Sequence, residues 1–298
     1  MTRRDIEFGA EDVTLRGWFY PAQGAPGATH ATIVMTHGYS AVKEMYLDRY
    51  AEVFAAAGLN ALVFDNRNFG ASDGQPRQEI DPWAQIRDYR HAITFAGTLP
   101  EVDTDRIGVW GSSYSGGHVL VVGALDRRVN AVVSQGAFVD GYQNFRRLVR
   151  ADFIAGFREQ FDADRLARYN GAAPAMVPVV DEDPLAPSAL PTPDSYEWFT
   201  ATHEAMAPSW RNEVTLRSVE MLGEYVPAAF IAYISPTPLL LLIASNDVLT
   251  PTDLAIAAYG NAREPKKIEI LPGGHFDIYA KGFELSSSLA RDWFTQHL

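Results

Sequence analysis

Short apolar runs, bounded by Gly, Pro or polar residues, recur toward both ends of the chain and predict a set of buried strands. One run, residues 238–245, is apolar along most of its length, which is typical of a strand buried on both faces of a parallel sheet. Residues 4–20 predict an antiparallel hairpin at the sheet edge, with residues 13–19 alternating imperfectly between apolar and polar. The other predicted strands span 31–36, 60–64, 106–110, 131–135 and 266–271.

The segments between these runs predict helices near residues 43–57, 82–97 and 114–125. Strands that alternate with helices are typical of a mostly parallel central sheet with helices on both faces. We therefore assign the chain to the α/β class.

The alternation stops after residue 137 and resumes only near residue 239. Ordinary connections rarely exceed about 12–15 residues without structure of their own. We therefore expect residues 139–235 to form an inserted lid (cap) above the active site, and residues 1–138 and 236–298 to form the core.

Apolar positions at helical spacing predict a helix at the start of the lid, and a Pro-rich stretch then runs from Pro174 to Pro193. Helices are predicted again at 195–206 and 208–222. The lid is rich in aromatic residues, which indicates a largely apolar pocket for a bulky acyl or alcohol group. It also carries an arginine series, interpreted as a solvated helix face with ion pairs, with a clamp for a substrate carboxylate as the alternative. The series is Arg146, Arg147, Arg150, Arg158, Arg165 and Arg168.

Composition excludes several kinds of partner. The chain has 298 residues, a formal net charge of −12 and no cysteine. The negative charge argues against nucleic acid or an anionic membrane surface as partner. The missing cysteines exclude disulfides and thiolate metal sites. The first residues lack the apolar stretch of a signal peptide, and no run is long enough to span a bilayer, so a cytoplasmic location is expected. The sequence is compatible with a homo-oligomer.

Ser113 is the strongest candidate for chemistry. It lies between the predicted strand 106–110 and the predicted helix 114–125, inside the small-residue turn Gly111–Gly117. A serine on a sharp strand-to-helix turn is exposed above the sheet edge and can act as a nucleophile. The usual pattern of this turn is Gly-x-Ser-x-Gly, and Ser115 stands here at the last glycine. Because serine is small, we expect the turn to be kept.

A base and an acid follow Ser113 in the chain. Asp247 comes just after the run 238–245, and His275 follows the strand 266–271 behind two glycines. The carboxyl ends of parallel strands meet at one sheet edge, so the three side chains are expected to converge there. In a Ser-His-Asp triad the histidine takes the serine proton and the aspartate orients the imidazole.

Other acidic and basic residues are weaker candidates. Asp140 is the main rival for the acid, whereas Asp277 lies too near His275 in sequence to orient it. Asp253 is interpreted as a first-turn residue of a helix. His37 is interpreted as a residue that orders its loop.

Backbone N–H groups complete the predicted site. The loop after strand 31–36 contains His37-Gly38-Tyr39, and Tyr114 follows the proposed nucleophile. In such sites one oxyanion-hole donor comes from each of these loops. We predict the N–H groups of Tyr39 and Tyr114 as donors, with the Tyr39 hydroxyl as the alternative. Asp65 and Arg67, in the next strand's loop, are expected to form a structural ion pair.

The sequence resembles the dienelactone-hydrolase-like group of the α/β-hydrolase superfamily, near the X-Pro dipeptidyl-peptidase-like serine hydrolases, esterases and fungal polyketide transferases. The motifs that carry the resemblance are residues 36–39, 65–72, 111–117, 246–247 and 273–277. The resemblance implies the α/β-hydrolase fold. Dienelactone hydrolases proper use a cysteine nucleophile, and this chain has none, so their activity is not implied.

The residues and the resemblance together predict a serine hydrolase that cleaves a carboxylic ester, lactone or thioester through an acyl-enzyme on Ser113. One alternative passes the same acyl group to an alcohol or amine, as an acyltransferase. Others are an amidase or peptidase, or a binding protein without catalysis. No cofactor or metal is implied, because the chain contains no His-Glu-x-x-His, paired-cysteine or phosphate-loop motif.

Overall fold

In the computed structural model, which describes residues 3–24 and 27–298, eight strands form one sheet in the order β1-β2-β4-β3-β5-β6-β9-β10. Strand β2 pairs antiparallel with β1 and β4, and the remaining neighbours are parallel. The strands are β1 (Arg4–Ala10), β2 (Val13–Tyr20), β3 (His30–Thr36), β4 (Asn60–Phe64), β5 (Val102–Ser112), β6 (Val129–Gln135), β9 (Leu239–Ala244) and β10 (Lys266–Leu271).

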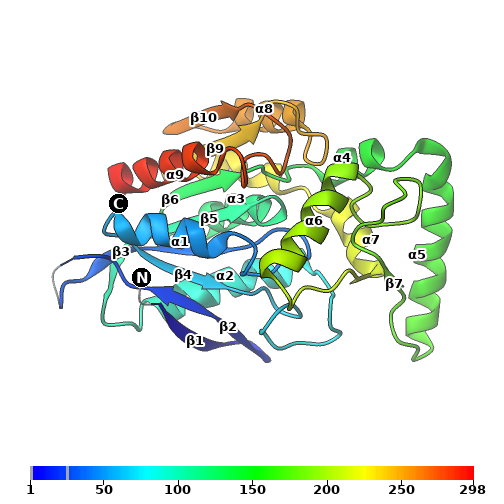
Figure 1. Cartoon of the computed structure of the whole chain (residues 1–298), viewed down its shortest axis with the longest axis horizontal. Helices are drawn as coiled ribbons and strands as arrows, with labels where there is room; N and C mark the ends of the chain where they lie inside the picture. The colour runs from blue at the N-terminus through cyan, green and yellow to red at the C-terminus, as the bar shows by residue number, and fades with distance from the viewer. Residues whose placement is uncertain (1–2, 25–26) are drawn as a thin grey trace.

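Helices cover both faces of this sheet (Figure 1). Side chains alternate across each strand, so Ile33 and Met35 pack in one buried cluster while Val34, between them, packs in the other. The first cluster includes residues of α1 (Leu47–Ala56) and α9 (Phe283–His297). The second includes residues of α2 (Pro82–Ala96), α3 (Tyr114–Leu125) and α8 (Thr252–Asn261).

Local chemistry explains where the central helices begin. Asp81 caps α2 by accepting hydrogen bonds from the N–H groups of Trp83 and Ala84, and Pro82 occupies the first turn, where its missing N–H is not needed. Every residue of α3 from Tyr114 to Ala124 is buried. A helix that is apolar all round belongs in the interior of a protein. This buried helix follows Ser113 directly.

The part of the 139–235 segment from α4 to α7 lies at one end of the molecule, with α5 at its outer edge (Figure 1). Helix α6 carries Trp198, whose ring stacks on Phe276 of the core with centroids 4.8 Å apart. The segment contains α4 (Gly141–Leu148), η1 (Ala151–Phe153), α5 (Ile154–Tyr169), β7 (Met176–Val177), α6 (Pro193–Met206), β8 (Val214–Thr215), α7 (Leu216–Glu224) and η2 (Pro227–Tyr233).

The α/β class, the edge hairpin and the predicted strands are confirmed, with bounds that differ by a few residues. The predicted helix 208–222 is wrong in its first half, because α7 begins only at Leu216. Val214 and Thr215 pair instead with β7, and the Asn212 side chain exchanges hydrogen bonds with the backbone of Val180. Thr215 then caps α7 by accepting from the Ser218 N–H. None of the described helices combines the length and apolar character needed to cross a membrane.

The two glycines of the edge hairpin provide a test of this packing. A Cβ added to Gly17 would lie 1.9 Å from the carbonyl oxygen of Val63 in β4, whereas one added to Gly9 would meet nothing within 4 Å. We expect Gly17→Ala to lower the free energy of unfolding by about 1–3 kcal/mol, because a backbone neighbour must shift. Gly9→Ala should change it by less than about 0.5 kcal/mol. Urea unfolding midpoints measure both, and equal effects would contradict the tight β2–β4 contact.

Candidate active site

Ser113 lies on a sharp turn between β5 and α3. Its φ of 55° and ψ of −118° are strained for a residue other than glycine. The turn is held by its own backbone, since the Ser113 N–H donates to Gln135 O at 2.8 Å and its carbonyl accepts from Phe138 N at 2.9 Å. A Cβ at Gly111 would lie 2.3 Å from Ser115 O, so the close approach of the two arms requires glycine there. The side chain is partly exposed, while its neighbours are buried.

Ser115 fits the turn although the usual pattern has glycine at this position. It is fully buried, and its Oγ lies 2.6 Å from the Tyr89 hydroxyl and donates to Thr36 O at 3.1 Å. The Tyr89 hydroxyl also lies 2.9 Å from Trp110 O. These bonds tie the start of α3 to the carboxyl ends of β3 and β5. The expectation that serine is tolerated is therefore confirmed, with Tyr89 as its partner.

His275 and Asp247 form a buried hydrogen-bonded pair. The distance from His275 Nδ1 to Asp247 Oδ2 is 2.7 Å, and both side chains are at most 2% exposed. Because a carboxylate accepts, Nδ1 carries the proton and Nε2 is left as the basic nitrogen. Asp247 Oδ1 accepts from the N–H groups of Leu249 and Thr250 at 3.0 and 2.7 Å. These bonds hold the carboxylate in place.

Thr250 is a residue that sequence reasoning missed. Its Oγ1 lies 2.9 Å from Asp247 Oδ2, 3.1 Å from His275 Nδ1 and 3.0 Å from Gly136 O. The hydroxyl thus contacts both members of the pair and the loop after β6. Its place three residues after Asp247 was visible in the sequence, but a threonine before a proline carries no signal of its own.

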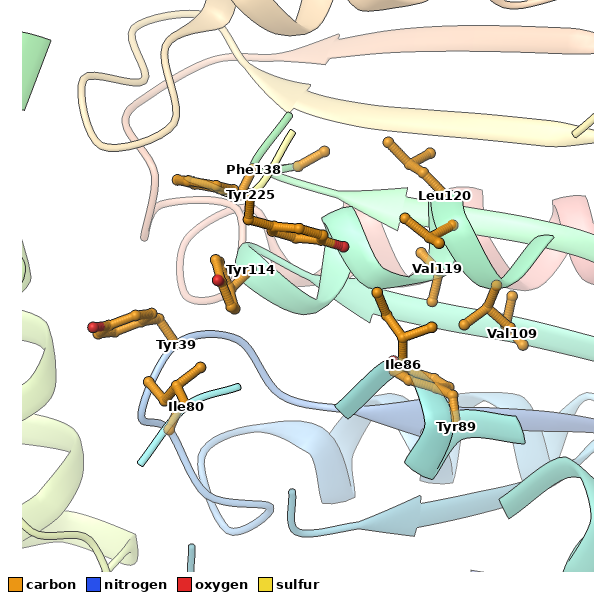
Figure 2. Close-up of a cluster of buried hydrophobic side chains, with 14 of the residues drawn as sticks. Tyr39, Ile80, Ile86, Tyr89, Val109, Tyr114, Val119, Leu120, Phe138 and Tyr225 are labelled. Atoms are coloured by element: carbon orange, nitrogen blue, oxygen red, sulfur yellow. The ribbon is translucent and has the colours of Figure 1, made fainter. Parts of the chain in front are cut away.

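The loop after β3 passes directly beside Ser113. A Cβ on Gly38 would lie 2.7 Å from Ser113 Cβ and 3.3 Å from its Oγ. The N–H groups of Tyr39 and Tyr114 have no hydrogen-bond partner within residues 3–24 and 27–298. The two rings pack edge to face at 5.4 Å, and Figure 2 shows the Tyr114 ring between Tyr39 and Tyr225. The Tyr39 hydroxyl is buried and also unpaired in the described part of the chain, and burial raises its pKa.

Ser113 and His275 line one small cavity of about 20 Å³, close to the volume that one water molecule needs. Within the described residues, no hydrogen bond joins Ser113 Oγ to the imidazole. Such bonds are often long before substrate binds. The other lining residues come from the loop after β3, from the 139–235 segment and from the loops after β9 and β10. They are His37, Gly38, Tyr39, Ala41, Leu190, Trp198, Phe199, Leu249, Phe276 and Tyr279.

The rival acids are occupied elsewhere. Asp140 caps α4 by accepting from Gln143 N, and Asp277 accepts from Gly274 N and pairs with Lys281. Asp253 lies in the first turn of α8, as expected, and pairs with Arg147. None of these carboxylates contacts His275 in the part of the chain that the structure describes.

Asp65 and Arg67 do not pair with each other, which corrects that expectation. Asp65 lies 2.6 Å from Lys43 Nζ and also accepts from the Lys43 and Ala71 N–H groups. The Arg67 guanidinium forms a bidentate ion pair with Asp88, in which Nε donates to Oδ2 at 2.8 Å and Nη2 donates to Oδ1 at 2.6 Å. Strand β4 ends at Phe64 and the chain turns at Arg67, so the two side chains meet different elements.

The arginine series of the 139–235 segment is mostly engaged in ion pairs. The pairs are Arg147–Asp253, Arg150–Asp152, Arg165–Glu220 and Arg168–Asp164, and Arg146 lies over the Tyr142 ring. This matches a solvated helix face rather than a free clamp for carboxylate. Among the described residues, no group of three or more His, Asp or Glu side chains is placed to hold a metal ion.

Two buried histidines near the site are structural. His37 Nδ1 accepts from Gly38 N at 2.8 Å and Nε2 donates to Met45 O at 2.7 Å, so both nitrogens order the loop. His118 Nε2 donates to Gln85 Oε1 at 2.9 Å and Nδ1 accepts from the Tyr225 hydroxyl at 3.0 Å. Burial lowers the pKa of His37 to about 4 and that of His118 to about 3. Both are neutral at pH 7.

A family model described as "Alpha/beta hydrolase family" matches residues 33–281. The chain belongs to the α/β-hydrolase family. It is 33% identical over 281 residues to a thiohydrolase of Eupenicillium brefeldianum, covering 93% of this chain and 88% of that protein. It is 32% identical over 286 residues to a polyketide transferase of Penicillium crustosum, covering 94% and 92%. The crystal structure of the α/β hydrolase GrgF from Penicillium sp. sh18 superposes with a TM-score of 0.85 at 28% identity, covering 100% of this chain and 99% of that one.

The buried histidines predict an acid-sensitive fold. An unfolded histidine binds a proton near pH 6.5, whereas His118 in the folded protein does so only near pH 3. The free energy of unfolding should therefore fall as the pH drops from 6.5 toward 4, by about 1.4 kcal/mol per pH unit for this residue. His118→Asn should remove that part of the slope even if it lowers stability overall. Urea titrations at several pH values measure it, and an unchanged slope would contradict the assignment.

Proposed function

We propose that the protein is a serine hydrolase that cleaves a carboxylic ester, lactone or thioester through an acyl-enzyme on Ser113. One observation carries the proposal. The imidazole of His275, hydrogen-bonded at 2.7 Å to the buried Asp247, lines the same cavity as the strained, partly exposed Ser113. A serine in that position with an oriented base is the arrangement that acyl transfer to a hydroxyl requires.

The geometry supports the following sequence of steps. Ser113 Oγ attacks the substrate carbonyl while His275 Nε2 takes its proton. The tetrahedral intermediate collapses, and the imidazolium gives the proton to the leaving alcohol or thiol. A water molecule then repeats the attack on the acyl-enzyme and regenerates Ser113. Asp247 stabilises the imidazolium in both halves, and Thr250 positions the pair by contacting both members.

We further propose that the unpaired N–H groups of Tyr39 and Tyr114 bind the oxyanion. Both belong to residues beside Ser113, and the Tyr114 N–H is at the first turn of α3, where the helix dipole favours negative charge. The strained backbone of Ser113 fixes the attacking oxygen relative to these donors.

We propose that residues 139–235 act as a lid over the core formed by 1–138 and 236–298. Leu190, Trp198 and Phe199 from this segment close the cavity over Ser113. A cavity of about 20 Å³ is too small to hold a bulky acyl group, so we expect the lid to move as substrate binds. The apolar lining supports a neutral acyl substrate with a bulky apolar group.

A specific feature also favours an acyltransferase as second candidate. The cavity holds about one water molecule and is lined mainly by aromatic and apolar side chains, so a lid that closes on the acyl-enzyme would limit hydrolysis. The relatives include proteins named for each activity, a thiohydrolase and a polyketide transferase. Product ratios from one thioester, with and without an added alcohol or amine, separate the two.

The nucleophile is tested by intact-mass spectrometry after treatment with a fluorophosphonate. We expect one label on the wild type, none on Ser113→Ala, and one on the matched control Ser112→Ala, whose buried neighbouring hydroxyl plays no part in the reaction. Turnover of nitrophenyl esters should follow the same pattern. A folded wild type that neither labels nor turns over ester would overturn the proposal.

Tyr39→Phe separates the two candidate oxyanion donors, since it removes the hydroxyl and keeps the N–H. If the N–H is the donor, kcat should stay within about threefold of wild type, whereas loss of a true donor costs about a hundredfold or more. The measurement is kcat for a nitrophenyl ester under saturating conditions. A hundredfold loss with unchanged KM would assign the role to the hydroxyl.

A further inference from the structure

A second and larger hollow lies in the 139–235 segment, outside the cavity that holds Ser113. It is a groove of about 370 Å³, within the range of about 300–1,000 Å³ typical of small-molecule sites. We call it the outer groove. It runs between the region that joins α4 to α5 and residues 184–191, and it includes Leu148, Phe157, Pro184 and Leu185.

One wall of the outer groove is a single helical face. Phe153, Gly156, Phe157 and Gln160 all line it, and their spacing of three, four and seven residues places them on one side of η1 and α5. A Cβ added to Gly156 would meet nothing within 4 Å, so there is open space for a side chain at this position. The facing wall is rich in proline.

The charges at the groove cancel each other. Arg150 and Asp152 line it, and Arg150 Nε donates to Asp152 Oδ1 at 2.7 Å. No other Lys, Arg, Asp or Glu lies among the lining residues that the structure describes. The groove therefore suits an uncharged, mostly apolar chain, and it offers a carboxylate or phosphate no free cation.

The outer groove and the Ser113 cavity share a wall. Ser188 and Pro191 line the groove, while Leu190, between them, lines the cavity. Two backbone bonds hold this strip, from Ala189 N to Pro178 O at 2.9 Å and from Leu190 N to Val179 O at 2.8 Å. Proline supplies no N–H, so Pro187 and Pro191 add no further donors.

The shared wall also contains an unmet hydrogen bond. Ser188 is 5% exposed, and its hydroxyl has no partner among the described residues. Buried hydroxyls without a partner are rare and unfavourable. A chain that carries an oxygen and displaces this strip would give the hydroxyl a partner.

We propose that the outer groove binds the distal, uncharged part of the acyl group whose carbonyl is attacked by Ser113, with Leu190 as the gate between the two spaces. The proposal rests on the serine hydrolase function above and names its substrate class: medium- to long-chain neutral acyl esters or thioesters. The Ser113 cavity is too small for such a chain, and the groove on the other side of one strip of residues is large enough.

Gly156 allows a direct test by substitution. Gly156→Trp places an indole in the groove, whereas the matched control Gly156→Ala adds only a methyl group to an open position. We measure kcat/KM for nitrophenyl acetate and nitrophenyl decanoate. Wild type and Gly156→Ala should prefer decanoate. Gly156→Trp should lose at least about tenfold on decanoate, since each methylene excluded from a pocket is worth that order, and stay within about twofold on acetate.

Binding separates failure of this inference from failure of the proposed function. In the Ser113→Ala background, calorimetry with methyl decanoate should show binding that Gly156→Trp weakens at least about tenfold and Gly156→Ala leaves unchanged. If Gly156→Trp hydrolyses both acetate and decanoate esters as fast as wild type, the groove does not bind the acyl chain. The proposed hydrolase function would be unaffected by that result. A wild type without turnover or labelling would overturn the hydrolase, and the calorimetric result would then decide the groove alone.

Discussion

The site depends on one constraint, the strained turn at Ser113. A positive φ at a residue with a side chain is unfavourable, and it persists only where the surroundings hold it. Here Gln135 O at the end of β6 accepts from the Ser113 N–H, Phe138 N donates to the Ser113 carbonyl, and Gly111 lets the two arms of the turn approach. The buried helix α3 then fixes everything behind the serine. The proposed oxyanion donors and the loop of Gly38 are arranged around this turn.

Hydrogen bonds connect the turn to the other loops at the same sheet edge. Ser115 and Tyr89 link the start of α3 to the end of β3, from which the Gly38 loop departs. Thr250 links Asp247 to the carbonyl of Gly136, next to the strand end that holds Ser113. The proposed catalytic groups lie on separate loops, and these buried bonds set the distances between them. A parallel sheet supplies the common edge, and the side-chain bonds supply the precision that loops lack.

The sequence predicted the features that follow from local patterns. Apolar runs located the strands, and the glycine-rich turn located Ser113. The order of Ser113, Asp247 and His275 after successive strands predicted that they share an edge, and Asp247 and His275 are in contact. Contacts between segments that are distant in sequence could not be predicted from these patterns. Lys43 as the partner of Asp65, Asp88 as the partner of Arg67, and Tyr89 behind Ser115 each depend on how loops pack, which periodicity does not encode. The start of α7 was missed for the same reason, because the pairing of β7 with β8 joins two segments far apart in sequence.

Three of the buried polar atoms without a partner in the described part of the chain lie at or near the Ser113 cavity. Folded proteins rarely leave buried donors without partners, yet Tyr39 Oη, Trp198 Nε1 and Ser188 Oγ are unpaired within the described residues. Two of these residues line the Ser113 cavity, and the third lines its shared wall with the outer groove. Atoms of this kind gain most when a polar molecule enters, because each new hydrogen bond replaces none. The cavity of about 20 Å³ beside these atoms is therefore a place where entry of a polar group would be favourable.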